Sequence, residues 1–218
     1  MFPDPLHLAI ALGPLAVYFL LVGMINLSSR PLVTTGARDA AALGVGLSGL
    51  VFAGPMELFL PEDAAIHFGW VVWLLLLAFY GLCLTLIVLV MRPRLVIYNV
   101  TADQLRPLLA DVVNELDREA RWAGESLVLP NLDVQLHIEP IGFFRNAELV
   151  ASGPHQSFVG WKRLENVLAE ALKESRGEPN SYGIVPLLFG LLLIALVTFT
   201  AVSNRQELTQ ALFEMLRI

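Results

Sequence analysis

The stretch WVVWLLLLAFYGLCLTLIVLVM, residues 70–91, contains no charged side chain and decides the class of this protein. An α-helix rises about 1.5 Å per residue, so about 20 apolar residues cross the hydrocarbon layer of a bilayer. Three further windows, residues 6–27, 40–60 and 183–203, have a similar length and apolar character. Extended to residues 68–91, the quoted stretch is the third of four predicted transmembrane helices.

Residues 92–180 differ from these windows because charged side chains recur throughout them. The 218-residue chain is 16% charged with a mean hydropathy of +0.66, whereas soluble chains carry about 25% charged residues. We therefore predict a polytopic α-helical membrane protein (four transmembrane helices) with a small α+β extramembrane domain inserted between helices 3 and 4. The predicted parts are a three-helix transmembrane region at 1–91, the soluble domain at 92–180, the fourth transmembrane helix at 181–203 and an amphipathic C-terminal helix at 204–218.

The soluble domain has the order strand–helix–strand–strand–strand–helix. Thr101 and Gln104 have the spacing of a capping box, which predicts that a helix starts there and continues to residue 116. Residues 133–139 alternate apolar and polar, as in a strand with one buried face. The other expected elements are strands at 94–100, 126–130 and 146–152 and a helix at 161–175.

The short flanks of the predicted transmembrane helices differ in charge. Basic residues follow the first and third helices and precede the fourth, whereas the turn after the second contains Glu62 and Asp63 without lysine or arginine. Cytoplasmic flanks carry the excess of basic residues. We therefore expect both termini outside and residues 92–180 in the cytoplasm, at the inner (cytoplasmic) membrane of a bacterium. The basic residues behind this orientation are Arg30, Arg38, Arg92, Arg94, Lys173 and Arg176, and Arg205 opposes it.

Composition excludes several classes of function. The net charge of −6, without a basic run, argues against nucleic acid as a partner. A single cysteine, Cys83, excludes disulfides and cysteine-rich metal sites. No nucleophile elbow, zinc-protease motif, phosphate loop or dinucleotide fingerprint occurs. We therefore expect no enzymatic activity and no cofactor held by the chain alone.

The second predicted helix is rich in small residues at four-residue spacing. Small side chains let membrane helices approach closely, since lipid gives helices no hydrophobic reason to associate. We expect this helix to pack centrally against its neighbours. The helix-packing residues are Ala41, Ala42, Gly46, Gly49, Ala53 and Gly54.

Glu57 is a carboxylate at the end of an apolar segment, one turn before Pro61. At that depth a solvated or hydrogen-bonded helix end is the simpler interpretation. The alternative is a polar or divalent-metal site on the outer face, where carboxylates and imidazoles would meet. A single histidine there could instead bind a pigment or line a quinone site. The residues of this outer-face cluster are Asp4, His7, Glu57, Glu62, Asp63 and His67.

The last sixteen residues have helical periodicity with one apolar stripe. Asn204 and Glu207 have the spacing of a cap, and the segment has no basic face. We expect it to dock on a partner; the alternatives are a helix lying in the membrane interface and a frayed terminal helix. The stripe consists of Leu208, Leu212, Met215 and Leu216.

These patterns favour a non-catalytic integral membrane subunit that packs on and stabilises a larger membrane complex, an energy-transducing one being a candidate, through a cytoplasmic interaction domain. Its partners would be membrane lipids and other membrane protein subunits, and any pigment or quinone would come from the partner complex. A first alternative is a channel or transporter component assembled as a homo-oligomer around the second helix. A second is a membrane enzyme or metal-binding protein that uses the outer-face cluster.

Overall fold

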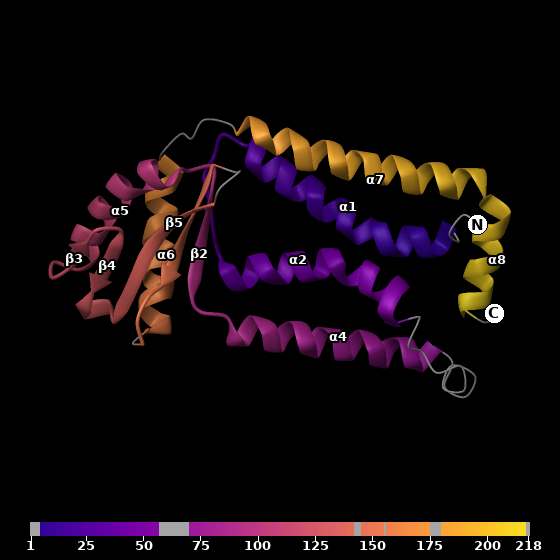
Figure 1. The fold of residues 1–218 in the computed structure, drawn as a ribbon, viewed down its shortest axis with the longest axis horizontal. Helices are drawn as coiled ribbons and strands as arrows, with labels where there is room; N and C mark the ends of the chain where they lie inside the picture. The colour runs from indigo at the N-terminus through magenta and orange to yellow at the C-terminus, as the bar shows by residue number, and fades with distance from the viewer. Residues whose placement is uncertain (1–4, 57–69, 142–144, 155, 175–179, 217–218) are drawn as a thin grey trace. The chain divides into compact units, whose positions relative to one another are not determined.

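The computed structural model describes residues 5–56, 70–141, 145–154, 156–174 and 180–216. The chain forms two compact units. The helical unit comprises Met1–Val22, Ala41–Leu89 and Val185–Ile218, and the sheet-bearing unit comprises Gly23–Ala40 and Val90–Ile184. Figure 1 labels the elements of both units.

Three described helices are long and apolar enough to cross a membrane, which indicates an integral membrane protein. They are α1 (Pro5–Leu27), α4 (Trp70–Val90) and α7 (Ile184–Ser203), the last preceded by the single 3-10 turn η3 (Ser181–Gly183). They coincide with the first, third and fourth predicted transmembrane helices. The chain ends with α8 (Arg205–Leu216).

The second predicted transmembrane helix differs from the other three. The α-helix α2 (Gly36–Val51) begins before residue 40 and continues as the π-helix η1 (Phe52–Met56). Pro55 has no N–H to pair with residue 51, which an α-helix would require there. Residues 57–60 of the predicted span lie outside the described residues, so a fourth span stays a prediction.

The sheet-bearing unit contains six antiparallel strands in the order β1-β2-β6-β5-β4-β3. Four of them, β2, β4, β5 and β6, lie where the sequence predicted strands. The two additional strands stand at the edges of the sheet, and β1 comes from the connection between α1 and α2. The strands are β1 (Leu32–Thr35), β2 (Arg94–Tyr98), β3 (Arg121–Ala123), β4 (Ser126–Leu129), β5 (Val134–Ile141) and β6 (Asn146–Ala151).

Two amphipathic helices, α5 (Ala102–Leu116) and α6 (Phe158–Glu174), bury one face of this sheet. Thr101 and Gln104 form the predicted capping box at the start of α5. The core is built mainly of leucine and valine, and each fully buried side chain of this kind contributes about 1.5–3 kcal/mol. A short 3-10 helix, η2 (Pro130–Leu132), links β4 to β5.

Candidate functional site

The outer-face cluster predicted from the sequence falls almost entirely outside the described residues. Asp4, Glu57, Glu62, Asp63 and His67 are not described, and His7 lies in α1. Among the described residues, no group of three or more His, Cys, Asp or Glu side chains is placed to hold a metal ion. The outer-face cluster stays a prediction.

The glycines of α2 lie against the neighbouring helix α1. A methyl group at Gly49 would collide with the backbone carbonyl oxygen of Ile10, and one at Gly46 would come within 2.8 Å of the Cβ of Tyr18. Gly54 has nothing within 4 Å of the corresponding position. Of the other small residues, Ala41 and Ala53 are half-buried and Ala42 is exposed. The close approach of α1 and α2 thus depends on two of the six residues named from the sequence.

The opposite side of α2 contacts α4. A methyl group at Gly44 would collide with Leu84, and Tyr80 donates a hydrogen bond from its hydroxyl to the carbonyl oxygen of Gly44 at 2.6 Å. The rings of Phe52 and Trp73 stack with centroids 4.7 Å apart. No local sequence pattern marks Tyr80, because its partner is a backbone atom 36 residues away.

A third contact joins α1 to α7. The rings of Phe19 and Phe189 meet edge to face with centroids 4.9 Å apart. A methyl group at Gly190 would lie only 3.0 Å from the carbonyl oxygen of Ala16. Within the helical unit these contacts follow the order α7, α1, α2, α4 that Figure 1 shows. Between its two neighbours α2 leaves apolar side chains exposed on two opposite sides. Val45, 62% exposed, lies on one side, and Leu43, Leu47 and Leu50 lie on the other.

Buried asparagines form a second candidate site, in the sheet-bearing unit, which we call the asparagine junction: Asn26, Asn99, Asn146 and Asn180. Asn99 follows β2 with a φ of +65°, a left-handed conformation that asparagine adopts more readily than most residues. Its Nδ2 donates to the carbonyl oxygens of Ile25 at 2.6 Å and Arg30 at 3.3 Å. Its backbone N–H donates to Oδ1 of Asn146 at 3.0 Å. The end of β2 is thereby fixed to the last turn of α1 and to the start of β6.

Asn180 extends the asparagine junction to the start of α7. Its backbone N–H donates to the carbonyl oxygen of Asn26 at 3.1 Å, and its Oδ1 accepts from the N–H of Tyr182 at 3.1 Å. Gly183 packs so closely that a methyl group there would come within 2.8 Å of the Cβ of Asn26. The asparagine junction therefore joins α1, β2, β6 and η3. The Nδ2 of Asn99 and the Oδ1 of Asn180 are thus paired, whereas Oδ1 of Asn99 is buried without a hydrogen-bond partner among the described residues. The hydrogen bonds that are made indicate a holding role for the asparagines.

Charged groups gather on the sheet face that α5 and α6 leave uncovered. Arg94 lies 3.3 Å from Glu148, and Glu148 stands directly opposite Glu139 in the register of β5 and β6. Burial raises the pKa of Glu148, Arg94 opposes this effect, and the carboxylates of Asp39 and Glu139 add to it. Like charges in such a cross-strand pair are unfavourable unless a cation compensates them. Here the guanidinium group of Arg94 compensates the carboxylate of Glu148.

Two further contacts flank this charged face. The hydroxyl of Tyr98 donates to Oδ1 of Asp39 at 2.5 Å, and Arg38 donates to Glu165 on α6 at 2.8 Å. Both therefore fix the first turn of α2 to the sheet-bearing unit. On the face itself, His137 also contacts Glu139, so the described side chains there form ion pairs and hydrogen bonds.

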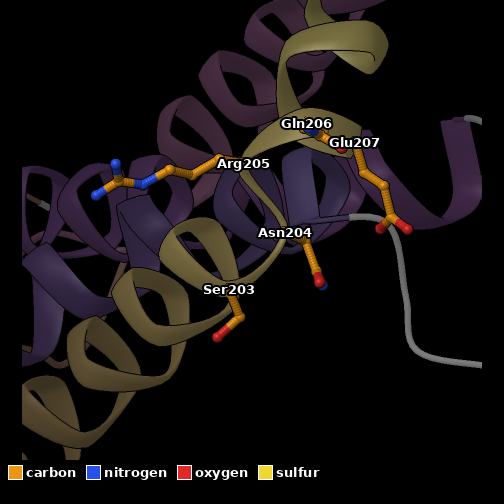
Figure 2. Close-up of a pocket in the computed structure, with 5 residues that line it drawn as sticks. All are labelled: Ser203, Asn204, Arg205, Gln206 and Glu207. Atoms are coloured by element: carbon orange, nitrogen blue, oxygen red, sulfur yellow. The ribbon is translucent and has the colours of Figure 1, made fainter.

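A shallow polar recess lies at the turn between α7 and α8, lined by residues 203–207 (Figure 2). In Figure 2 the side chain of Arg205 extends to the left, whereas those of Asn204 and Glu207 extend toward the lower right. The cation thus points away from the amide and the carboxylate, so these groups do not converge on one point. On α8 itself Leu208 is half-buried and Leu212 is exposed, while the side chains of Met215 and Leu216 are not described. Docking through this stripe stays a prediction.

Comparison of the chain with protein-family models, with curated proteins and with solved structures gives no match.

Proposed function

We propose that this chain is a non-catalytic integral membrane subunit that packs on and stabilises a larger membrane complex. The observation that supports this proposal is the position of α2 between two helices. This helix contacts α1 through Gly46 and Gly49 and α4 through Gly44, and still leaves Val45 62% exposed. Glycines of this kind place α2 in the middle of the helical unit, and we propose that a further protein helix covers the side that carries Val45.

The extramembrane part fits an interaction domain. The asparagine junction and the Arg38–Glu165 pair tie the ends of α1, α2 and α7 to the sheet. These contacts fix the segments of the sheet-bearing unit to one another, and a preorganised surface lowers the entropic cost of docking a partner. We propose that it does so in the cytoplasm of a bacterium, with four membrane spans and both termini outside, as the basic flanks indicate.

The same side of α2 supports one alternative, a channel or transporter component assembled as a homo-oligomer. In that case a second copy of the chain would cover Val45. The two functions make different predictions for the molecule bound at Val45, so one experiment separates them.

The test is site-specific photo-crosslinking in the native membrane. A photoreactive residue replaces Val45 in one variant and, as the control, Leu82 of α4, which is 69% exposed within a bulky helix expected to face lipid. We expect the Val45 variant to form a crosslink to a different membrane protein and the Leu82 variant to form far less. A crosslinked dimer of the chain would contradict the subunit proposal in favour of the homo-oligomer. Equal, negligible crosslinking at both positions would overturn both.

A further inference from the structure

Phe158 and Val159, the first two residues of α6, are 80% and 75% exposed. Among the described residues 94–180, no other large hydrophobic side chain is exposed. Leaving two such side chains in water at adjacent positions is unfavourable, and exposed apolar groups of this kind mark contacts with membranes or proteins. They therefore need a partner outside the described chain.

Basic residues accompany this apolar pair. Lys162 and Arg163 are exposed and lie one helical turn after Phe158 and Val159, so the four side chains share one face of α6. Arg118 and Arg121 lie at the same end of the unit. Asp117, the residue before Arg118, accepts a hydrogen bond from the N–H of Asn131 in η2, and η2 leads directly into the start of β5. The acidic groups at this end are Glu119, Asp133 and the buried Asp117. Lys162, Arg163, Arg118 and Arg121 thus outnumber these three carboxylates around the pair.

The position of the pair in the unit follows from backbone hydrogen bonds. Ser157 donates its N–H to the carbonyl oxygen of Asp133 at 2.8 Å, which places the start of α6 beside the start of β5. At the same end of the sheet Ala151 donates to the carbonyl oxygen of Pro93 at 3.0 Å. Pro93 is the third residue after Val90, where α4 ends. Since β5 and β2 are separated only by β6, the start of α6 lies about 10 Å along the sheet from the chain leaving α4.

We propose that Phe158, Val159, Lys162 and Arg163 form a second contact with the membrane, docking the sheet-bearing unit on an anionic bilayer surface. Aromatic and aliphatic side chains enter the boundary between headgroups and acyl chains to a depth of about 5–10 Å, and neighbouring cations bind anionic headgroups. This surface is separate from α2, so its role does not depend on the proposed subunit function.

The test uses the full chain with Cys83 replaced by serine and a cysteine at Val159, labelled with an environment-sensitive fluorophore. The protein is reconstituted into vesicles of phosphatidylcholine with phosphatidylglycerol that contain a lipid quencher near the headgroup. The control places the label at Glu170, which is exposed on the same face of α6 about 16 Å further along the helix. We expect the label at 159 to be quenched several-fold more than the label at 170. The charge reversals Lys162→Glu and Arg163→Glu should lower that quenching, as should vesicles of phosphatidylcholine alone.

Equal quenching at 159 and 170 would overturn the proposal. A second outcome would also overturn the proposal. If the lipid quencher in vesicles leaves the label at 159 unquenched, but native membranes shield that label from an aqueous quencher, the patch binds a protein partner. Circular dichroism of each labelled variant checks that the fold is retained.

Discussion

At the scale of single residues, buried polar side chains hold separate segments of the sheet-bearing unit together. Asn99 binds the last turn of α1, and Asp117 binds the loop after α5 to η2. The two carboxylate oxygens of Asp117 accept hydrogen bonds from the N–H of Glu119 at 2.9 Å and from the N–H and Nδ2 of Asn131 at 2.8 and 2.7 Å. A buried donor that loses its acceptor costs about 1–3 kcal/mol, so few of these residues tolerate replacement.

The substitution Asp117→Asn should therefore destabilise the protein. An amide offers one oxygen in place of two and turns its NH₂ group toward other donors, so we expect a loss of about 1–3 kcal/mol in the free energy of unfolding. Thermal unfolding of the purified protein in detergent measures it. Asp111→Asn on the exposed face of α5 is the matched control and should have almost no effect. A loss at Asp111 as large as that at Asp117 would contradict the assignment.

The contribution of Asp117 to the free energy of unfolding should fall at acidic pH. Burial alone would raise the pKa of Asp117, but the hydrogen bonds from Glu119 and Asn131 outweigh it and hold that pKa below its ordinary value of 3.8. The unfolded chain thus binds the proton more readily, so the stabilisation is complete above the ordinary value and is lost as the pH falls through the folded pKa. Asp117→Asn should remove this part of the acid destabilisation.

At the scale of elements, glycine sets the spacing of α1 and α2. The obstacle to a side chain at Gly49 is the backbone oxygen of Ile10, which cannot rotate away as the end of a side chain can. Neighbouring helices must then separate, and the contacts along the whole interface weaken.

Gly49→Ala should accordingly destabilise the helical unit, by about 1–3 kcal/mol for an overpacked site. Gly81→Ala in α4 is the control, because nothing lies within 4 Å of the added methyl group and alanine is the better helix former. The measurement is the thermal midpoint of both variants in one detergent. Equal midpoints would show that α1 and α2 do not approach at Gly49.

The elements predicted correctly are those whose signal is local. Residues 70–91 and the alternation in 133–139 identify α4 and β5 without knowledge of the rest of the chain. The strand β1, LVTT, has four residues and no alternation, and its pairing with β2 joins Leu32 to Tyr98. Such a non-local pairing has no sequence signal of its own. The asparagine junction was missed for the same reason, since Asn26, Asn99 and Asn180 are distant in sequence and meet only after folding.

At the scale of the whole molecule, the sheet is part of the connections between membrane helices. The link from α1 to α2 supplies β1, α4 continues within a few residues into β2, and the asparagine junction meets the start of α7. Removal of the last turn of α1 would therefore leave Nδ2 of Asn99 without its acceptor at Ile25.

The proposed topology makes a prediction for cysteine labelling. With Cys83 replaced by serine, a cysteine at Gln206 should react with a membrane-impermeant maleimide in intact cells, because the C-terminal helix is expected outside. A cysteine at Asp103, in the domain, should react only after the membrane is opened. Reaction of both residues in intact cells, or of neither, would contradict a span at α7 between them.

The measurement that tests the central proposal most directly is the mass and composition of the native assembly, purified from its own membranes in a mild detergent. The proposal of a non-catalytic subunit predicts a particle much larger than the 24.0 kDa chain, with other membrane proteins in fixed ratio. It also predicts that Val45→Trp releases the chain from that particle while Leu82→Trp does not. A monodisperse single chain without a partner, unchanged by either substitution, would contradict it.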